Sequence, residues 1–400
     1  MAQHPPVETA RQAILFTSSY CMGGIEAHLS DLAVGLIRRG WKVAVICSTL
    51  QDIEPLRTNL RSIGADVYPV GEASTPWQLL QRTWRILRVL RRHREGVVHL
   101  HLQGDAGGLL VLVAARLAGC KAVVRTLHNP PVPPITRSLR TMIALTDQLV
   151  DRIVCVSPET RRAQLDEFRR DPRKLVVIAN GVDVERFSPT GPDDGVRREL
   201  GLETDAEVVG TVARLQEERK GIGAFVEMAG KLASRRPNAR FVIVGDGPLR
   251  TRLEAQADHL GLGQRVTFTG YRRDVPKLLR AMDVAVFPSS YEAAQYVMLE
   301  AMATALPVVL TPAGLAIDLV QPGRTGVLVR VGDVEGLTDA VDDVLNDRAA
   351  AARMGRAARQ VIVEDYSTDA MVNALAGLYA ELIDVRSRQR ARSAGALDLR

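Results

Sequence analysis

The sequence predicts an α/β fold with two Rossmann-like domains in tandem, each built on a parallel sheet. Short β-branched runs alternate with longer stretches of helical periodicity, which is typical of parallel sheets covered by helices. This alternation stops once, at a polar stretch between about residues 182 and 206, and then restarts. The length agrees, because 400 residues with 46% hydrophobic side chains exceed what one core usually organises.

The predicted elements follow this alternation along the chain. A strand at AILFTS, a helix over about residues 26–39 and a strand at KVAVICS come first, and further strands follow at VVHLHL, KAVVRTLH and RIVCVS. After the polar stretch, strands are predicted at VVGTVARL, RFVIVGDGP, RVTFTG, VAVFPS, LPVVLT and TGVLVR. We therefore expect one domain at residues 1–185, a second at 186–366, a helix at 367–385, and a polar tail at 386–400 that is disordered.

Composition and charge narrow the class of protein. A net charge of +6 suits phosphate-bearing ligands or an anionic membrane, and no zinc-finger or aromatic-basic motif favours nucleic acid as a partner. The sequence has neither a signal-peptide pattern nor an uninterrupted apolar span. The cysteines stand singly in apolar runs, which is typical of core residues in a reducing compartment, at Cys21, Cys47, Cys120 and Cys155. We expect a cytoplasmic protein.

The stretch YEAAQYVMLEAMA places Glu292 and Glu300 on either side of a loop-to-helix junction. If the helix begins near Tyr296, Glu300 lies in its second turn and Glu292 in the preceding loop. A helix N-terminus offers unpaired amides and a partial positive charge, which suit a diphosphate. Two flanking carboxylates can then accept hydrogen bonds from sugar hydroxyls. Two surface acids at an ordinary helix start would give the same spacing.

Two cations, Arg214 and Lys220, follow a predicted strand in VARLQEERKG. They lie at the sheet edge where parallel sheets gather ligands. Fixed cations there can hold a diphosphate and stabilise it as it leaves, at about 1.5–3 kcal/mol for each charge-assisted contact. A solvated charged loop also fits the run EERK. No Asp-x-Asp triplet occurs in the chain, so we expect no metal at the leaving group.

The first domain carries weaker signals. Gly23 and Gly24, in CMGGIEAH, stand at the first strand-helix turn, where backbone can approach a phosphate closely. His128 ends a strand and faces the same carboxyl edge, although a lone histidine is more often structural. His99 and His101 alternate on one strand and can share a face, as metal ligands do. With no third ligand apparent, we interpret them as packing residues.

Residues 77–94, WQLLQRTWRILRVLRRHR, predict a basic amphipathic helix. In one interpretation the apolar side packs on the sheet of the first domain and the arginines are solvated. In the other, the helix docks on an anionic membrane and brings the acceptor side of the protein to a lipid-linked substrate. The apolar side chains that recur at helical spacing are Trp77, Leu80, Trp84, Leu87, Val89 and Leu90. The basic side chains between them are Arg85, Arg88, Arg91 and Arg92.

Taken in order, GGIEAH, NGVDVERFSP, ARLQEERKG, VGDGPLR, the Glu-x7-Glu stretch and PVVLTPAG resemble the retaining nucleotide-sugar glycosyltransferases of family four. The match covers residues 14 to about 370. The resemblance implies the two-Rossmann architecture called GT-B, with the active site in the cleft and a final helix returning to the first domain. It also implies a hexosyltransferase that moves a sugar from a UDP- or GDP-linked donor to a hydroxyl acceptor, with retention and without a metal or other cofactor.

The resemblance also implies roles for the candidate site residues. Glu300 would bind the donor ribose and Glu292 the donor hexose, while His128 would lie near the reacting sugar. Donor-binding residues at or near the diphosphate would be Arg214, Lys220 and the amides of Val297 and Met298. The remaining donor-binding candidates are Gly23, Gly24, Tyr271, Arg272 and Gln295.

Some positions depart from the family pattern. The six-residue step from Arg214 to Lys220 looks like that of mycobacterial phosphatidylinositol mannosyltransferases, whereas a step of five is common, so Arg219 is an alternative to Lys220. Ala293 stands where the family usually has glycine, and Gln295 stands where it usually has glycine or proline, which leaves the donor sugar open. Leu315 replaces a second glycine after Gly314, and nothing in the sequence explains it.

Two other functions stay open at this stage. A sugar-nucleotide 2-epimerase of similar two-domain build would also bind a nucleotide diphosphate. A non-catalytic sugar-nucleotide-binding protein would keep the fold without turnover. The acceptor, which serves glycan, glycolipid or glycosylated-metabolite synthesis, is not encoded in these motifs.

Overall fold

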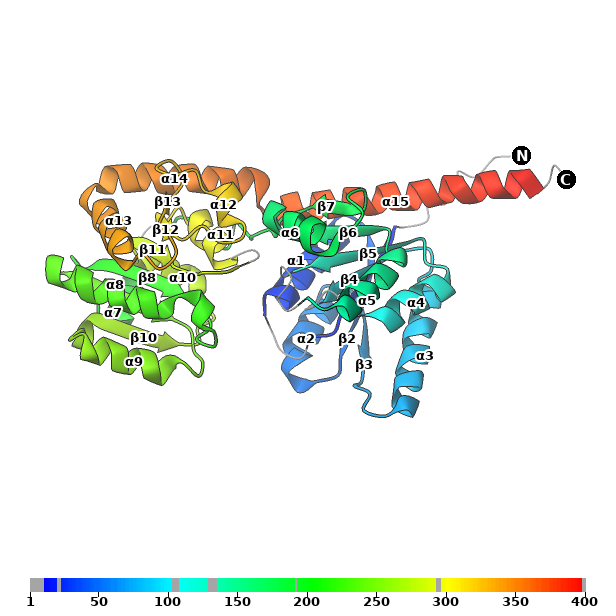
Figure 1. Cartoon of the computed structure of the whole chain (residues 1–400), viewed down its shortest axis with the longest axis horizontal. Coiled ribbons are helices and arrows are strands. Elements are labelled where there is room, and N and C mark those ends of the chain that lie inside the picture. Colours follow the sequence, from blue (N-terminus) through cyan, green and yellow to red (C-terminus); the bar gives the residue numbers. More distant parts are fainter. Residues whose placement is uncertain are drawn as a thin grey trace. The chain divides into compact units, whose positions relative to one another are not determined.

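The computed structural model describes residues 11–19, 23–102, 108–128, 135–190, 193–292 and 296–397 (Figure 1). The chain divides into two compact units. Unit 1 contains residues 1–179 and 368–400, and unit 2 contains residues 180–367. Each unit has a parallel sheet with helices, so the predicted α/β fold class is confirmed.

The sheet of unit 1 has the strand order β3-β2-β1-β4-β5-β6-β7, and all its pairs are parallel. The order reverses between β1 and β4, and the crevice at the carboxyl ends of two such strands is where open α/β sheets bind ligands. The strands are β1 (Gln12–Thr17), β2 (Lys42–Ser48), β3 (Asp66–Val70), β4 (Val97–Leu102), β5 (Ala122–Leu127), β6 (Arg152–Cys155) and β7 (Leu175–Val177).

The strands of this sheet are buried on both sides because helices cover both of its faces. Neighbouring residues on β1 belong to different cores: Leu15 packs with α1 and α15, while Ile14 packs with α3 and α4. A short 3-10 helix, η1 (Gln51–Ile53), precedes α2. The helices are α1 (Gly24–Arg38), α2 (Glu54–Ser62), α3 (Pro76–Arg92), α4 (Leu109–Ala118), α5 (Arg137–Gln148), α6 (Pro158–Phe168) and α15 (Thr368–Leu397).

Strand β3 was not among the predicted strands. It lies at the edge of the sheet and contains Pro69. Proline cannot donate to a ladder, so a sheet accommodates it at an edge. Most of β3 is exposed or half-buried, which breaks the apolar run that revealed the other strands.

Unit 2 has a parallel sheet in the order β10-β9-β8-β11-β12-β13. Its strands are β8 (Glu207–Val212), β9 (Ala239–Val244), β10 (Val266–Gly270), β11 (Val284–Phe287), β12 (Val308–Leu310) and β13 (Val327–Leu328). Its helices are α7 (Asp194–Glu199), α8 (Ile222–Arg235), α9 (Arg250–His259), α10 (Val275–Ala281), α11 (Tyr296–Ala303), α12 (Ala316–Leu319), α13 (Val334–Asn346) and α14 (Arg348–Asp365), with 3-10 turns η2 (Glu218–Lys220) and η3 (Gly263–Arg265).

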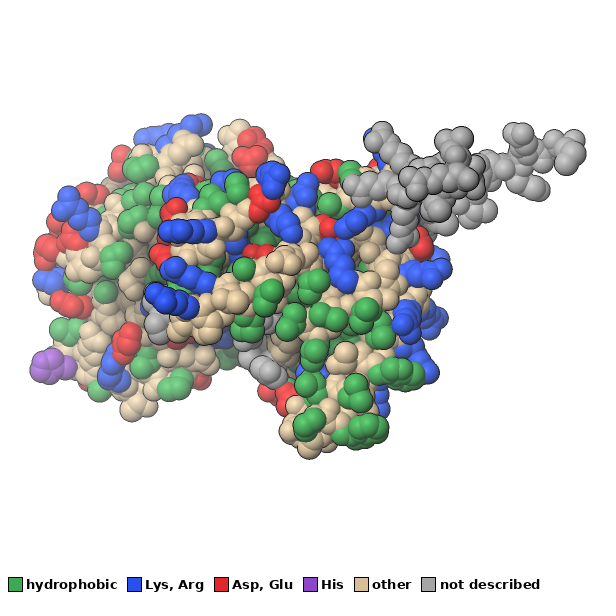
Figure 2. Space-filling view, turned by 45° about the vertical axis from the view of Figure 1, so that its right-hand side comes forward, with side chains coloured by type: hydrophobic (Ala, Val, Ile, Leu, Met, Phe, Trp, Pro, Cys, Tyr) green, Lys and Arg blue, Asp and Glu red, His purple; other side chains and the backbone are tan. Residues whose placement is uncertain are grey.

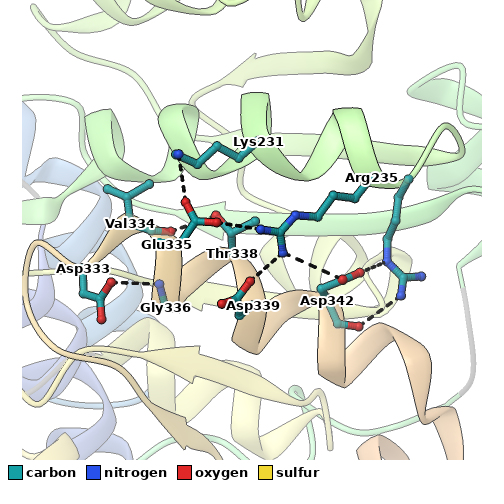
Figure 3. A network of polar contacts seen from close by, with 10 residues as sticks. Lys231, Arg235, Asp333, Val334, Glu335, Gly336, Thr338, Asp339 and Asp342 are labelled. Atoms are coloured by element: carbon teal, nitrogen blue, oxygen red, sulfur yellow. Dashed lines mark hydrogen bonds and ion pairs between the residues drawn. The ribbon is translucent and has the colours of Figure 1, made fainter.

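A polar network joins α8 to α13 on the surface of unit 2 (Figure 3). Lys231 lies 2.9 Å from Glu335, and Arg235 lies 2.6 Å from Glu335 and 2.5 Å from Asp339. Single exposed ion pairs contribute little, but a shared network resists the loss of any one member. The network supports α8, the helix that follows directly after the Lys220 loop.

The final helix, α15, belongs to unit 1 although it follows unit 2 in the chain. Leu375 and Tyr379 are completely buried in the unit 1 core that α1 also covers. Near its start, Arg39 of unit 1 binds Asp369 at 2.8 Å and Asn373 at 2.8 Å. The helix continues to residue 397, so the prediction of a disordered tail at 386–400 is wrong for residues 386–397. Arginine and alanine are strong helix formers, and they extend α15 beyond its apolar face.

The cysteines of the described residues are reduced and buried, as predicted, at Cys47, Cys120 and Cys155. Burial raises the pKa of the Cys47 and Cys120 thiols to about 11, so both are unreactive thiols at neutral pH. Cys21 lies outside the described residues.

Replacing Leu375 by alanine should lower the free energy of unfolding of unit 1 by about 2–5 kcal/mol, because a fully buried side chain is removed. Val385→Ala, on the same helix at 45% exposure, is the control and should change it by less than about 0.5 kcal/mol. Urea unfolding followed by tryptophan fluorescence reports on unit 1, which holds all of the chain's tryptophans, Trp41, Trp77 and Trp84. Equal shifts in both variants would contradict the packing of α15.

Candidate functional site

The loop that carries Arg214 is held against the loop after β9. The amide of Ala213 donates to the carbonyl of Val244 at 2.9 Å. Gly245 has a φ of +136°, and a Cβ on it would lie 1.9 Å from the Ala213 carbonyl oxygen. Only glycine allows this approach. Arg214 therefore extends from a fixed backbone, and its side chain is exposed to solvent.

Lys220 is placed by a second close approach. It ends η2, and Gly221 follows with a φ of +69°. A Cβ on Gly221 would lie 2.0 Å from the carbonyl oxygen of Pro288, directly after β11. The amide of Ser290 donates to the carbonyl of Arg219 at 2.8 Å. The Lys220 loop thus lies against the carboxyl end of β11, the neighbour of β8 in the sheet.

This contact brings Lys220 and Glu292 together. The Lys220 ammonium forms an ion pair with Glu292 Oε1, while Arg219 Nη1 lies 3.6 Å from Glu292 Oε2. Arg219 also donates to the carbonyl of Tyr291 at 2.9 Å, and Ser289 donates to Glu292 Oε1 at 3.3 Å. Glu292 is buried, so these donors offset the loss of water around its carboxylate. The site residue Lys220 and its alternative Arg219 both contact Glu292.

Helix α11 begins at Tyr296, the predicted start, and Glu300 lies in its second turn. Met298 is fully buried and anchors this end of the helix in the core, while Val297 is half-buried. The first amides of a helix have no acceptor within it. Glu292 therefore precedes a helix N-terminus of the kind that binds anions. Gln295, with Ala293, lies outside the described residues.

Tyr271 and Arg272 follow β10 and differ in their surroundings. Tyr271 is 75% exposed. Arg272 forms ion pairs with Asp274 at 2.7 Å and with Glu199, and these hydrogen bonds raise its pKa. Its guanidinium links the end of α7 to the start of α10. The hydrogen bonds of Arg272 to these two carboxylates give it a structural role, while the predicted donor contact stays a prediction.

In unit 1, α1 begins at Gly24, and Gly23 is its N-cap. No side chain caps this end of the helix. Gly23 is in the extended region, at a φ of −167°, so its backbone conformation is open to any residue. A Cβ on Gly23 would lie 3.4 Å from Glu26 Oε2, which is ordinary contact.

His128, which comes directly after β5, belongs to a buried cluster of histidines. Its Nε2 lies 3.2 Å from Nδ1 of His101 on β4. The ring of His28, on α1, is centred 5.1 Å from that of His101 and 5.0 Å from that of His128. His99 hydrogen-bonds Thr126 at 2.7 Å. Burial lowers the pKa of His99, His101 and His128 well below the ordinary value, and charge repulsion among the rings lowers it further, so these imidazoles are neutral.

The packing interpretation of His99 and His101 needs correction for His101. His99 is a packing residue, bonded to Thr126 and to the Tyr379 hydroxyl of α15. His101 instead faces two further imidazoles that the sequence analysis did not connect with it, because residues 28 and 128 are far from it in the chain.

Sequence reasoning missed two residues of these sites. Ser289 ends the predicted strand VAVFPS, and its place at a carboxyl edge is a signal that points to ligand or site contacts. His28 stands four positions after Gly24 in GGIEAH, one helical turn into α1. That spacing places it below the helix N-terminus, on the buried side.

Gly221→Ala should destabilise unit 2 more than Gly261→Ala does. Both glycines have nearly the same φ, +69° and +68°, so both variants carry about 1–2 kcal/mol of backbone strain. Nothing lies within 4 Å of a Cβ on Gly261, whereas one on Gly221 overlaps the Pro288 carbonyl. We expect an extra loss of about 1–3 kcal/mol for Gly221→Ala.

Hydrogen exchange of the α8 and β11 amides measures this difference within unit 2. Equal losses of protection in the two variants would show that the contact with Pro288 does not constrain the Lys220 loop.

Comparison with known proteins gives the class of this protein. The model "Glycosyltransferase Family 4" matches residues 22–186, and "Glycosyl transferases group 1" matches residues 193–361. The chain is 30% identical over 308 residues to the UDP-Gal:alpha-D-GlcNAc-diphosphoundecaprenol alpha-1,3-galactosyltransferase of Escherichia coli, covering 74% of this chain and 78% of that protein. It is also 30% identical over 384 residues to the D-inositol 3-phosphate glycosyltransferase of Mycobacterium avium, covering 88% of each.

The fold agrees with these relatives. The crystal structure of Anabaena Alr3699/HepE in complex with UDP superposes with a TM-score of 0.80 at 22% identity, covering 92% of this chain and 100% of that one. Two parallel-sheet units of this kind make up the GT-B fold. The chain belongs to glycosyltransferase family 4 and is an enzyme of sugar transfer.

Proposed function

We propose that the protein transfers a hexose from a UDP- or GDP-linked sugar to a hydroxyl group of an acceptor, with retention at the anomeric carbon and without a metal ion or other cofactor. The observation that carries this proposal is the pairing of Lys220 with Glu292 at the carboxyl edge of the unit 2 sheet. A cation for a diphosphate and a carboxylate for a sugar hydroxyl lie side by side on fixed loops. The UDP-Gal in the name of the Escherichia coli relative and the UDP in the Anabaena complex support a nucleotide-sugar donor.

In this proposal the diphosphate is the leaving group, and negative charge grows on it as its bond to the sugar breaks. Lys220 and Arg214 would stabilise that charge, together with the first amides of α11, at Val297 and Met298. Such contacts accelerate the reaction because they strengthen in the transition state. Glu292 would accept a hydrogen bond from the hexose, and Glu300 would bind the ribose.

Unit 1 would supply the acceptor side and His128. A neutral imidazole has one donor and one acceptor nitrogen, so His128 can hydrogen-bond a sugar hydroxyl without placing a charge beside it. Gly23 and Gly24 would let the α1 backbone approach the donor phosphates. Buried, reduced Cys47, Cys120 and Cys155 support a cytoplasmic location.

Lys220→Met should lower kcat/KM for transfer by about 10- to 150-fold, because one charge-assisted contact of about 1.5–3 kcal/mol is lost while side-chain length is kept. Lys231→Met is the matched control, since Lys231 pairs on the surface of α8 and should leave transfer unchanged. Initial rates with purified nucleotide sugars and a chelator measure both variants.

Three results would contradict this assignment. A strict requirement for magnesium would show that a metal, and not Lys220, stabilises the negative charge on the leaving diphosphate. Epimerisation of the donor in the absence of acceptor would identify a 2-epimerase, while binding of donor with no turnover for any acceptor would identify a binding protein.

We further propose that the acceptor is lipid-linked and that unit 1 docks on an anionic membrane through α3 and α4. In the described part of the chain, no helix combines the length and the apolar character needed to cross a bilayer, so contact would be with the surface. The name of the Escherichia coli relative includes a diphosphoundecaprenol acceptor, which supports this choice. The Mycobacterium avium relative acts on an inositol phosphate by its name, so a soluble acceptor is the alternative outcome.

The two halves of α3 agree with different interpretations of residues 77–94. Ile86 and Leu90, in its second half, are buried against unit 1. Trp77, Leu80 and Trp84 are 66%, 61% and 52% exposed. The first half of the helix therefore presents large apolar side chains to solvent, as a membrane-docking helix does.

These side chains belong to a larger apolar surface. Helix α4 packs beside α3, and exposed apolar side chains lie on both helices, at Trp77, Leu79, Leu80, Trp84, Leu109, Leu110, Val113 and Leu117. Figure 2 shows hydrophobic side chains gathered at the lower right of the view, with Lys and Arg side chains along its right edge. Contiguous apolar surface of this kind marks interaction sites.

Arginines border the apolar surface and fit an anionic partner. Arg85, Arg88 and Arg92 are exposed on α3, and the Arg88 guanidinium lies 4.1 Å from the centre of the Trp84 ring. Each surface arginine contributes on the order of 1 kcal/mol to binding an anionic bilayer. This contribution falls with salt.

Replacing Arg85, Arg88 and Arg92 by serine should weaken binding to anionic liposomes roughly 100-fold at low salt. The same change at exposed Arg348, Arg353 and Arg356 on α14 is the control, because it removes the same charge from unit 2. Co-sedimentation with anionic and neutral liposomes measures both variants. Equal loss in the two variants, or equal binding to both liposomes, would point to a soluble acceptor.

A further inference from the structure

The imidazole rings of His28, His101 and His128 lie close together in unit 1. The proposed sugar transfer uses only that of His128. One ring nitrogen from each of His28, His101 and His128 lies within 4.8 Å of the other two. The residues come from α1, from β4 and from the end of β5. All three side chains are buried, so the packed sheet and helix hold their positions.

The spacing of these nitrogens fits a metal ion. His101 Nδ1 and His128 Nε2 are 3.2 Å apart. Zinc bonds of about 2.0–2.1 Å in a tetrahedral site place ligand nitrogens about 3.3–3.4 Å from one another. Two of the three nitrogens already have this spacing. A ring nitrogen of His28 lies within 4.8 Å of the other two, so the three nitrogens would draw closer together around one ion.

The chemical state of the cluster also fits. Each imidazole offers one ring nitrogen with a lone pair when the ring is neutral, and His101 turns its Nδ1 toward His128. Neutral imidazole binds zinc, copper and nickel well, whereas magnesium prefers oxygen ligands.

We propose that His28, His101 and His128 form a site for one divalent transition-metal ion, such as zinc, nickel or cobalt. Because the metal would occupy the His128 nitrogen, its binding would inhibit sugar transfer. This consequence rests on the proposed function, in which His128 lies beside the reacting sugar, whereas the metal site itself does not.

Cobalt titration of the metal-free full chain tests the site, because tetrahedral cobalt has a strong visible absorption. We expect saturation at one cobalt per chain and displacement by zinc. His101→Asn and His28→Asn should each weaken binding at least about 10-fold. His259→Asn, which removes an exposed histidine of α9, is the control and should bind as the parent does. Absorption that saturates equally in His101→Asn, or that never saturates, would overturn the site.

A measurement on the parent chain covers the case in which a buried variant fails to fold. In imidazole nitrogen spectra, one equivalent of zinc should shift the ring signals of His28, His101 and His128. The signals of His93 and His259 should stay in place. Shifts confined to those two residues would show that zinc binds elsewhere and would overturn the site.

Activity then separates the metal site from the proposed function. Zinc should inhibit transfer by the parent chain, and a chelator should restore it. If zinc occupies the three histidines and transfer continues at its full rate, the metal site stands and the role of His128 in transfer is wrong. If zinc does not bind there and the protein transfers sugar, the site is overturned and the proposed function stands.

Discussion

The contact between the Gly221 backbone and the Pro288 carbonyl is the constraint on which the unit 2 site depends. Strands β8 and β11 are neighbours, so the segments that follow them leave the sheet at the same edge. They can touch only where one of them lacks a side chain. Once they touch, Lys220 and Glu292, 72 positions apart in the chain, form an ion pair. The charge pair is thus a product of backbone geometry.

Unit 1 uses the same edge of a parallel sheet for a different kind of group. Its buried polar residues at the ends of β4 and β5 are neutral imidazoles, and no cation pairs with a carboxylate there among the contacts described for His101 and His128. Glu292 and His128 are both buried, so the difference comes from the residue type: histidine can give up its charge near neutral pH. One unit offers fixed charge to a ligand, and the other offers hydrogen-bonding groups and lone pairs.

Periodicity and motif order predicted the parts of the structure that depend on local sequence. The alternation of strands and helices gave the α/β class, and the start of α11 at Tyr296 follows from the loop-to-helix pattern around it. Strand β3 was not predicted because it is an edge strand that contains Pro69 and has no apolar run. The helix at residues 386–397 was not predicted because its sequence has helix-forming residues without an apolar face.

Contacts between distant residues were beyond the sequence alone. Arg272 pairs with Glu199, 73 positions away, and His28 meets His101 through the packing of α1 on the sheet. No spacing in a single chain encodes such a meeting. For the same reason, Arg219 was treated as a substitute for Lys220, although the two side chains contact the same carboxylate from one loop.

The return of α15 to unit 1 has a consequence for how the protein is made. Unit 2 is continuous in the chain and can complete its core as soon as its last helix leaves the ribosome. Unit 1 is synthesised first, but its core lacks Leu375 and Tyr379 until the final helix emerges. An apolar surface of unit 1 beside α1 therefore stays exposed while unit 2 folds.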